Sequence, residues 1–523
     1  MQNLNVCNTI INVPNTYKQA IASSERLKWT KAMNEEMGSL TANNTFDLVP
    51  LPIGRQLVGG RWVYKVNKDP SNNLNFKARY VAKGFSQSPG LDFNETYAPT
   101  AKMTSVRVIV DISVHDRLIV HQADCSNAYL NSDIDYEIYM KQPEGYEQGQ
   151  NLVCRLNKSI YGLKQSAYLW NATLIKFMET QNLLQSKIDP CVFVRKNKQE
   201  TLYVLIWVDD LIIAASSLEV LNDFKANFGS RFKIKDLGVL KWFLGIQFDI
   251  SDNVISMNQS LYVQTILERF NMSNCTPRTL PCDPSVYHLL EEKSDPLQDP
   301  TKYRELVGSL IYLMTGTRPD LAYVVNLLSR FMHSPTNLHM TLAIGVLKYL
   351  KHTSHYDLKF VNSKDNLNII GYSDSDFASD SDRKSFSGYA FKLNENSALI
   401  SWRSCKQTIV ATSTCEAEYI ALHEATNEAL FLRQLFAEFT KLPMQTVNIF
   451  ADNQGSICLA KHQNCHRRTK HISVKYHATR DYVAKNYILI TYIPTNHNIA
   501  DMFTKPLPGP KLKSFAIIRG RIT

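Results

Sequence analysis

The chain has 523 residues, of which 44% are hydrophobic and 20% are charged, as in globular proteins that bury hydrophobic cores. A net charge of +10 favours a polyanionic partner, for which nucleic acid is the usual candidate. The ten cysteines form no C-x-x-C pair, and neither a signal peptide nor an apolar run of about 18 residues is present, which argues against a zinc ribbon, a disulfide framework and a membrane span.

The first predicted elements are a helix and two strands. Residues 27–40 (LKWTKAMNEEMGSL) favour a helix, and residues 61–66 (RWVYKV) and 76–85 (FKARYVAKGF) favour strands. Between Arg117 and Phe270, apolar strand-like runs alternate with helical runs. This alternation is typical of a mixed sheet with packed helices.

The second half of the chain begins with a connector. Residues 275–300 hold five prolines and many polar residues, as connecting segments do. Residues 303–335 and 342–353 are predicted to be helical, because apolar residues recur at steps of three and four. From Asn368 to about Pro506 strands and helices alternate again, so we expect two αβ units joined by a helical connection.

Two adjacent acids, Asp209 and Asp210, interrupt an apolar stretch, YVLIWVDDLIIAAS. Adjacent carboxylates repel, so the pair indicates either an acidic hairpin turn or a bound cation. Asp124 ends another apolar run, LIVHQADCSNAYL, far enough upstream for a crossover that places both strands side by side. Aspartates at such strand ends could hold divalent ions, and a metal pair stabilises the attacking and leaving oxygens of a phosphoryl displacement.

Four further acids lie in the last third of the chain, and each is separated from the next by enough residues for a strand, a turn and a helix. They are Asp374, Glu418, Asp452 and Asp501. Any one of them alone would be a surface residue by default. The group together suggests a second site with two metal ions near a scissile phosphate.

Several motifs resemble one known family. ADCSNAYL and WVDDL look like the two metal-binding motifs of reverse transcriptases, the second being a variant of the Y-x-D-D signature. KARYVAKGFSQSPGLDFNETYAPTAK, IYMKQPEGYE, LNKSIYGLKQSAYLW, DLGVLKWFLGIQF and TRPDLAYVVNLLSRF are similar to the copia-type LTR retrotransposon Pol polyproteins. The resemblance runs from about Ser24 to Leu507.

The resemblance implies an α/β (α+β) fold: a right-hand polymerase with fingers, palm and thumb, then a helical connection and a ribonuclease H-like αβ domain. The expected boundaries are a lead-in at 1–23, the reverse transcriptase at 24–270, the linker and helical thumb or connection at 271–367, the ribonuclease H-like domain at 368–507 and a basic tail at 508–523.

The resemblance also assigns roles in the polymerase half. Asp124, Asp209 and Asp210 would lie in the palm, where Asp124 and Asp209 bind two Mg²⁺, or Mn²⁺, and Asp210 participates less directly. Tyr129 is expected to act as a gate against the sugar 2′-OH, with packing as the alternative, and Gln165 to line the pocket of the incoming nucleotide. The primer-gripping hairpin would consist of Trp242, Phe243, Leu244 and Gly245; its simpler explanation, a strand with a close backbone approach at Gly245, is compatible.

A basic row is expected on the strand around KARYVAKGF. Alternation places Lys77, Arg79 and Lys83 on one face, opposite Ala78, Tyr80 and Ala82. A solvated face is the alternative, but in the family context we expect contact with phosphates, with Lys77 and Arg79 assigned to the nucleotide and Lys83 to the primer and template.

The later acids resemble the D-E-D-D set of ribonuclease H. The family pattern selects Asp374 over Asp376 or Asp380, and Glu418 over Glu416, with two Mg²⁺ again. His497 is a candidate proton carrier, although a loop histidine is more often polar surface.

The basic tract 461–485 is expected to contact the substrate backbone, with Lys475 and Arg480 outward and a packing stripe of Ile472, Tyr476, Thr479 and Val483. A zinc site through Cys465, His466, His471 and His477 is disfavoured, because paired thiolates are lacking.

The expected function is RNA-templated DNA synthesis followed by cleavage of RNA in the hybrid. The partners would be an RNA template, a DNA primer, the RNA–DNA hybrid, dNTPs and other parts of the Pol polyprotein. The expected location is the cytoplasm, in virus-like particles if the element is intact, with passage to the nucleus. The chain departs from the family pattern at two positions, with Trp207 for the tyrosine of the signature and Cys415 for a threonine. The alternative is therefore a degenerate or host-adopted remnant that binds nucleic acid without polymerising. A third, intermediate hypothesis is a hybrid nuclease with an inert polymerase half.

Overall fold

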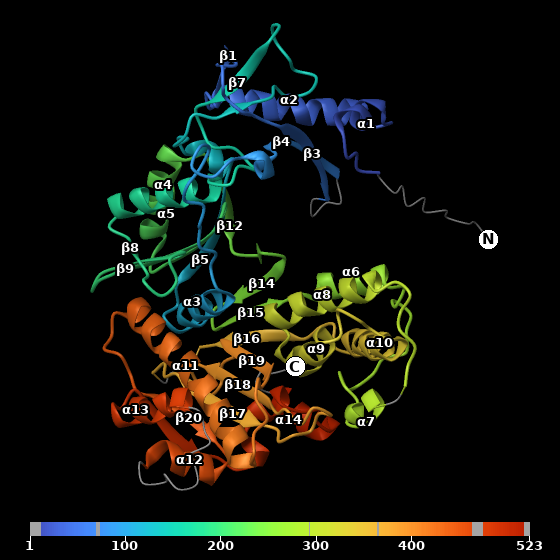
Figure 1. The fold of residues 1–523 in the computed structure, drawn as a ribbon. Helices are drawn as coiled ribbons and strands as arrows, with labels where there is room; N and C mark the ends of the chain where they lie inside the picture. Colours follow the sequence, from blue (N-terminus) through green and yellow to red (C-terminus); the bar gives the residue numbers. More distant parts are fainter. Residues whose placement is uncertain (1–11, 69–73, 292, 363–365, 463–473, 517–523) are drawn as a thin grey trace, which may run out of the picture.

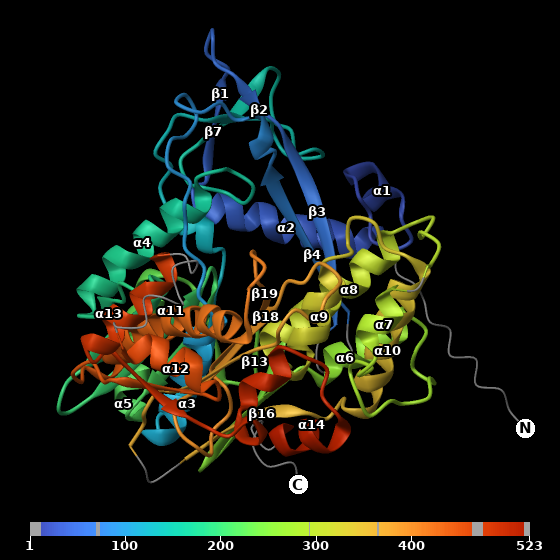
Figure 2. The same cartoon turned by 60° about the horizontal axis from the view of Figure 1, so that its bottom comes forward.

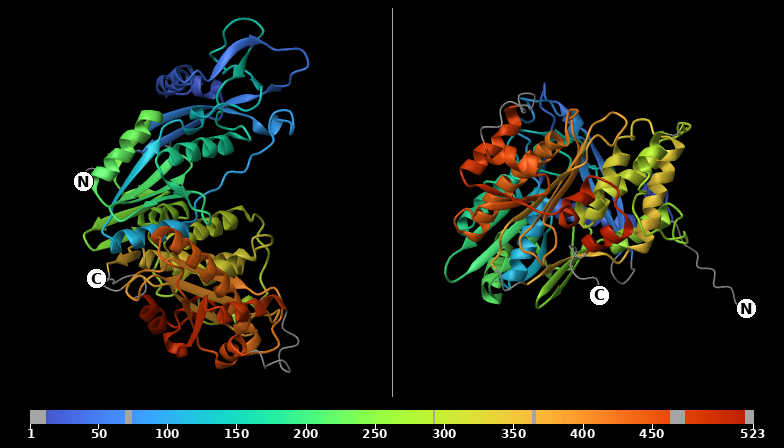
Figure 3. Two further views of the ribbon diagram at one scale, coloured as in Figure 1. Left: turned by 90° about the vertical axis from the view of Figure 1, so that its left-hand side faces the viewer. Right: turned by 90° about the horizontal axis from the view of Figure 1, so that it is seen from below.

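The structure is a computed structural model that describes residues 12–68, 74–291, 293–362, 366–462 and 474–516. The chain is elongated, with its N-terminal elements at one end and its last sheet at the other (Figures 1 and 3). Among the described residues, no helix combines the length and the apolar character needed to cross a bilayer.

The N-terminal end consists of helix α2 (Arg26–Ala42) and the long hairpin of β3 (Gly60–Lys68) and β4 (Leu74–Ala82). Figure 2 shows α2 lying against this hairpin. Trp29 of α2 is fully buried, with its ring centroid 5.2 Å from that of Tyr64 and 4.6 Å from that of Phe76. The helix and both strands predicted for this region are therefore confirmed.

A small sheet flanks the hairpin in the order β1-β7-β6-β2. Its strands are β1 (Phe46–Pro50), β2 (Leu57–Val58), β6 (Tyr139–Met140) and β7 (Leu152–Leu156). A short helix, α1 (Tyr17–Ala22), precedes α2.

The centre of the N-terminal half is a six-stranded sheet in the order β12-β5-β11-β10-β9-β8. The strands are β5 (Ile119–Cys125), β8 (Leu184–Gln185), β9 (Val192–Lys196), β10 (Thr201–Trp207), β11 (Asp210–Ala215) and β12 (Ile234–Val239). Alternate residues of β10 enter different cores, Tyr203 and Leu205 on one face and Leu202 and Val204 on the other. Helix α3 (Met103–His115) contributes to the first core, and α4 (Ser166–Thr180) and α5 (Leu218–Arg231) contribute to the second.

A four-stranded sheet joins segments that are far apart in the sequence. It consists of β13 (Trp242–Phe243), β14 (Ile246–Ser251), β15 (Val254–Asn258) and β16 (Asp357–Val361). Strand β15 pairs antiparallel with β16, from Val254 opposite Val361 to Asn258 opposite Asp357.

In the sequence, a run of helices separates β15 from β16. They are α6 (Ser260–Arg269), α7 (Val286–Glu291), α8 (Thr301–Gly316), α9 (Ala322–Ser329) and α10 (Asn337–His352). The helical character predicted for 303–335 and 342–353 is confirmed, and the connector at 275–300 also contains α7. The predicted domain boundaries remain predictions.

The last sheet has the order β19-β18-β17-β20-β21, with β20 parallel to both β17 and β21. Its strands are β17 (Ile370–Ser375), β18 (Phe386–Lys392), β19 (Ser401–Lys406), β20 (Val447–Ala451) and β21 (Ile488–Tyr492). The accompanying helices are α11 (Thr414–Thr440), α12 (Gln454–Lys461), α13 (Ala478–Ala484) and α14 (Gly509–Ala516).

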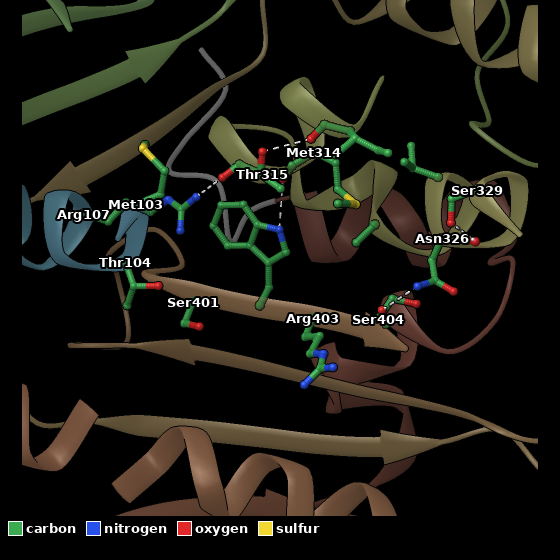
Figure 4. Close-up of a pocket in the computed structure, with 14 residues that line it drawn as sticks. Met103, Thr104, Arg107, Met314, Thr315, Asn326, Ser329, Ser401, Arg403 and Ser404 are labelled. Atoms are coloured by element: carbon green, nitrogen blue, oxygen red, sulfur yellow. Dashed lines mark hydrogen bonds between the residues drawn. The ribbon is translucent and has the colours of Figure 1, made fainter. Parts of the chain in front are cut away.

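Arg107 of α3 joins the two halves (Figure 4). Its guanidinium donates to the carbonyl oxygens of Ile400 and Gly316, both at 3.0 Å, and to that of Thr315. The guanidinium carbon lies 3.8 Å from the ring centroid of Trp402, and the Trp402 Nε1 donates to Met314 O at 3.1 Å. These contacts border a cavity of about 440 Å³.

Candidate active sites

The first group of acids, named here the hairpin site, consists of Asp124, Asp209 and Asp210. Strands β10 and β11 form a hairpin with Val208 and Asp209 as its two turn residues, because Trp207 pairs with Asp210. Asp210 also lies opposite Asp124 across the β11–β5 pair, and Cys125 N donates to Asp209 O at 2.7 Å. The hairpin turn is therefore acidic, as one of the two explanations for the adjacent aspartates predicted. The pairing of β11 with β5 also brings the distant Asp124 next to this turn.

The turn itself is conformationally unusual. Val208 has a φ of 59°, in the left-handed region that a β-branched residue rarely occupies. Its carbonyl accepts a hydrogen bond from the Trp170 Nε1 at 2.6 Å, which helps to hold the conformation. Backbone of this kind costs about 1–3 kcal/mol and clusters at functional sites.

The carboxylates of the hairpin site lack sufficient compensating charge. Burial, with Asp209 as the next cause, raises the pKa of Asp124, although Lys77, Lys235 and Arg79 oppose the rise. Burial and the two neighbouring aspartates raise the pKa of Asp210 to about 6. A bound cation would relieve this repulsion, so the donor set fits a divalent ion.

A cleft of about 610 Å³ contains Asp124 and Asp209 together with Lys77 and Arg79 of β4. Lys77 is exposed and Arg79 half-buried, whereas Ala78, Tyr80 and Ala82 are buried. The predicted alternation is therefore confirmed for β4.

Lys83 follows the end of β4. The side-chain stem of Lys83 lies next to Gly59, where an added Cβ would meet its Cδ at 3.1 Å. It is half-buried and does not line the cleft that contains the two aspartates.

Three side chains, those of Tyr129, Tyr161 and Arg79, contact one another beside the cleft. The ring centroids of Tyr129 and Tyr161 lie 4.5 Å apart, and the Arg79 guanidinium carbon is 4.1 Å from the Tyr161 centroid. Burial is the main cause that raises the pKa of Tyr129, and Asp209 adds to it. Tyr129 therefore lies near both the acids and the basic strand, where a sugar gate would have to be, and its gate role stays a prediction.

Gln165 is not at the surface of the cleft. It is fully buried, and its amide nitrogen donates to Asp92 O at 2.8 Å while its amide oxygen accepts from Gln87 Nε2 at 3.1 Å. The structure thus gives Gln165 an internal hydrogen-bonding role, and the predicted contact with a nucleotide would require these bonds to change.

The proposed primer-gripping residues form the tight hairpin of β13 and β14. Leu244 and Gly245 are its two turn residues, with φ of 51° and 73°, as in a type I′ turn. The Tyr312 hydroxyl donates to Leu244 O and would lie 2.5 Å from a Cβ at Gly245, so the close approach expected there is present. Phe243 is buried, whereas Trp242 is 42% exposed and free to contact a ligand.

The second group, named here the C-terminal site, consists of Asp374, Glu418, Asp452 and Asp501. Asp374 lies in β17 and Asp452 directly follows β20, so these parallel neighbours bring both acids to the same sheet edge. Glu418 comes from the first turns of α11, whose N-cap Ser413 accepts a hydrogen bond from Glu416 N. One ligand atom from each of Asp374, Glu418 and Asp452 lies within 4.8 Å of the others, close enough to hold a metal ion.

Asp501 completes the C-terminal site but is not a member of this triad. It is fully buried in a 3₁₀ turn (Ile499–Phe503), and its two carboxylate oxygens pair with the ammonium groups of Lys505 and Lys511. The Lys505 Nζ also lies 3.9 Å from Asp374 Oδ2, and the Thr504 hydroxyl donates to the same oxygen.

Burial dominates the electrostatics of the C-terminal site. It raises the pKa of Asp374 to about 7 against the opposing charge of Lys505. Burial, Asp374 and Asp452 together raise the pKa of Glu418 well above its ordinary value. As at the hairpin site, the carboxylates repel one another and fit a divalent cation.

The alternative acids have other partners. Asp376 accepts from Phe386 N, Asp380 pairs with Arg330 and Lys406, and Glu416 accepts from both Thr412 N and the Thr412 hydroxyl at 2.7 Å. The structure thus favours the set of acids that the family pattern selects.

The prediction that Arg480 points outward is wrong, because its side chain turns inward. The Arg480 Nε donates to Leu459 O at 2.6 Å, and its guanidinium also bonds the Tyr419 hydroxyl. Packing of α13 against α11 and α12 draws the guanidinium to these acceptors. Tyr476 and Thr479 are buried as the packing stripe requires.

The structure does not describe several other residues for which this tract carried predictions. Ile472, Cys465, His466 and His471 lie outside the described residues, as does the side chain of Lys475. His497 is exposed, and its role stays a prediction.

Sequence reasoning missed Lys505 and Lys511. The available signal was the spacing, because Lys505 lies four residues after Asp501 and one helical turn brings such residues together.

Known proteins resemble this chain over most of its length. A family model for reverse transcriptase (RNA-dependent DNA polymerase) matches residues 43–284. The retrovirus-related Pol polyprotein from transposon TNT 1-94 of Nicotiana tabacum is 38% identical over 518 residues, which are 96% of this chain and 38% of that protein. The corresponding protein from transposon RE1 of Arabidopsis thaliana is 36% identical over 505 residues, or 95% of this chain and 34% of that protein. The chain thus spans little more than a third of these relatives.

A solved structure has a similar fold. The foamy viral protease-reverse transcriptase, in complex with double-stranded DNA, superposes with a TM-score of 0.51 at 12% identity, covering 90% of this chain and 70% of that one. At this identity the likeness concerns the fold alone.

Proposed function

The chain belongs to the Pol proteins of copia-type retrotransposons, and we propose from this that it synthesises DNA on an RNA template and degrades RNA in the resulting hybrid. The convergence of Asp124 and Asp209 on one cleft with Lys77 and Arg79 carries the proposal for synthesis. The triad of Asp374, Glu418 and Asp452 supports the proposal for cleavage.

At the hairpin site, Asp124 and Asp209 would hold two Mg²⁺, with Mn²⁺ as a substitute, and Asp210 would act less directly. When bound, the ions polarise the α-phosphate and stabilise the attacking and leaving oxygens. The chain's own residues bind and orient the substrates: Lys77 and Arg79 face the triphosphate, and the β13–β14 hairpin positions the primer. Positioning and electrostatics would supply most of the rate.

Selection of deoxynucleotides is assigned to Tyr129. Its ring packs at a tilt against Tyr161, which in turn lies under the Arg79 guanidinium, so these contacts position both an aromatic wall and a phosphate ligand. A 2′-OH would meet this wall, whereas a deoxyribose would not.

At the C-terminal site, Asp374, Glu418, Asp452 and Asp501 would hold two Mg²⁺ that activate water and stabilise the leaving oxygen when bound. Recognition of a hybrid relies on its A-form shape and the 2′-OH, not on base sequence. Trp242 on the hairpin, and Lys83 and Lys475 elsewhere, would contact the nucleic acid backbone.

The partners we propose are an RNA template, a DNA primer, the hybrid, dNTPs and other parts of the Pol polyprotein. The proposed location is the cytoplasm, in virus-like particles, with passage to the nucleus. The presence of all seven acids at the two sites argues against a degenerate remnant that only binds nucleic acid.

Primer extension on poly(rA)/oligo(dT) with Mg²⁺, together with cleavage of a labelled RNA–DNA hybrid, tests both activities. Asp209→Asn should abolish incorporation and leave cleavage intact, and Asp452→Asn should do the reverse. Absence of incorporation in the parent chain would favour the remnant, and equal activities in the parent and both variants would refute the assignment of two sites.

A further inference from the structure

The four acids of the C-terminal site are not equivalent. Asp374, Glu418 and Asp452 bring ligand atoms within 4.8 Å of one another, so they form one ready cation position. Asp501 is fully buried and is satisfied by protein cations: Lys505 pairs with its Oδ1 and Lys511 with its Oδ2.

Lys505 is placed between two of the acids. Its ammonium pairs with Asp501 and lies 3.9 Å from Asp374 Oδ2, so it spans the position at which these two carboxylates would share an ion.

The lysine side chains have a path away from this position. The side chain of Lys505 is 38% exposed and that of Lys511 is 25% exposed, although Asp501 itself is inaccessible. An ammonium group on a flexible four-carbon stem can move toward water, whereas the carboxylates on the sheet edge and the 3₁₀ turn stay in place.

We propose that Lys505 is a built-in counter-cation of the C-terminal site, so that a divalent ion enters between Asp374 and Asp501 only by displacing its ammonium. The site then takes its ions in order, first at the triad of Asp374, Glu418 and Asp452, and second at Asp374 and Asp501. Lys511 assists by pairing with Asp501 Oδ2. This inference rests on the proposed nuclease function and makes Lys505 a positioning residue for the second ion.

As a consequence, the first and the second divalent ion would bind the C-terminal site with different affinities. A monovalent ammonium about 4 Å from a carboxylate competes directly with a divalent ion for the same charge. The competition weakens the second ion most, because the Lys505 ammonium pairs with Asp501 and lies 3.9 Å from Asp374 Oδ2. The protein would therefore keep its buried acids paired at low metal concentration and complete the nuclease centre at a higher one.

The test counts Mn²⁺ bound per chain by electron paramagnetic resonance of the free ion, with Mn²⁺ alone as the probe. The full chain carries Asp124→Asn and Asp209→Asn, so that binding at the hairpin site does not contribute. We expect one strongly bound and one weakly bound Mn²⁺ in this parent. Lys505→Met should tighten the second ion by about tenfold or more, because the competing charge is removed.

Three further variants sharpen the experiment. Lys513→Met changes an exposed lysine of α14, the helix that also carries Lys511, and should bind as the parent does. Lys505→Arg keeps the charge and should keep the second ion weak, which tests the idea even if Lys505→Met does not fold by circular dichroism. In Asp501→Asn, adding Lys505→Met should no longer strengthen a second ion.

The possible failures are distinguishable. If the parent binds no Mn²⁺ and the chain with an intact hairpin site cleaves no hybrid, the proposed nuclease function fails. If the parent binds one ion strongly but Lys505→Met leaves the second dissociation constant within twofold of the parent, the counter-cation inference alone is overturned. The same conclusion follows if Lys505→Arg tightens the second ion as much as Lys505→Met.

Discussion

Replacing Arg107 by Met should loosen the attachment of the C-terminal half to the six-stranded sheet. Methionine preserves the length and apolar character of the stem but removes the charge and every donor. Arg107 is 4% exposed and reaches three carbonyl oxygens, those of Ile400, Thr315 and Gly316, across the junction shown in Figure 4.

The loss in the free energy of unfolding caused by Arg107→Met is the balance of opposing contributions. Three hydrogen bonds from a charged donor contribute about 4–9 kcal/mol, and the Trp402 stack adds up to about 2 kcal/mol. Burial opposes them, because it lowers the pKa of Arg107 from 12.5 to about 9, which corresponds to about 5 kcal/mol. The carbonyls left without a donor cost about 1–3 kcal/mol each. The lost hydrogen bonds and the unpaired carbonyls describe the same three contacts and are not added together, so we expect a net loss of at most about 6 kcal/mol.

Urea unfolding, followed by intrinsic fluorescence and by limited proteolysis, measures this loss. Lys102→Met is the matched control, since its ammonium lies 3.9 Å from the Phe431 ring centroid across the same junction but the residue is exposed. An exposed cation–π contact is worth about 1 kcal/mol or less. Equal unfolding midpoints for the parent and Arg107→Met, or equal losses for both variants, would refute the reasoning.

Three other outcomes are expected. Burial raises the pKa of Asp111 from 3.8 to about 7, so folded protein retains a proton that the unfolded chain releases; stability should therefore fall by at most about 4 kcal/mol as pH rises from about 4 to 7. Asp111→Asn should flatten that dependence in urea titrations, and an unchanged slope would contradict the assignment. Gly245→Ala should reduce primer extension and destabilise the hairpin by about 1–3 kcal/mol, because its Cβ would meet the Tyr312 hydroxyl at 2.5 Å. Gly238→Ala, with the same φ of 73° and no atom within 4 Å, controls for backbone strain alone, so equal effects of the two changes would remove the contact from the explanation. Tyr129→Val should raise the incorporation of ribonucleotides relative to deoxynucleotides by about tenfold or more, and an unchanged ratio would leave Tyr129 with packing only.

The elements of the fold were readable from local pattern. The alternation in β4 placed Lys77 and Arg79 away from the buried face, and acids at strand ends marked where the chain could gather carboxylates. Such inferences succeed because side-chain direction in a strand follows from a period of two residues.

Contacts between segments that are distant in the sequence could not be predicted from local sequence patterns. The inward turn of Arg480 depends on an acceptor in α12, and the burial of Gln165 depends on Gln87 and Asp92. The ion pairs of Lys505 likewise depend on how a 3₁₀ turn meets β17. A propensity or a motif carries no information about which partner tertiary packing will supply.

The pairing of β15 with β16 has a mechanical consequence. The helices α6 to α10 leave the sheet from one strand and return to the strand beside it, so the whole helical excursion is closed at its base. Hydrogen bonds from Trp402 to Met314 O and from Asn326 to Ser404 O also join α8 and α9 to the last sheet. The paired strands and these bonds would keep the distance between the hairpin site and the C-terminal site constant while the chain works as proposed.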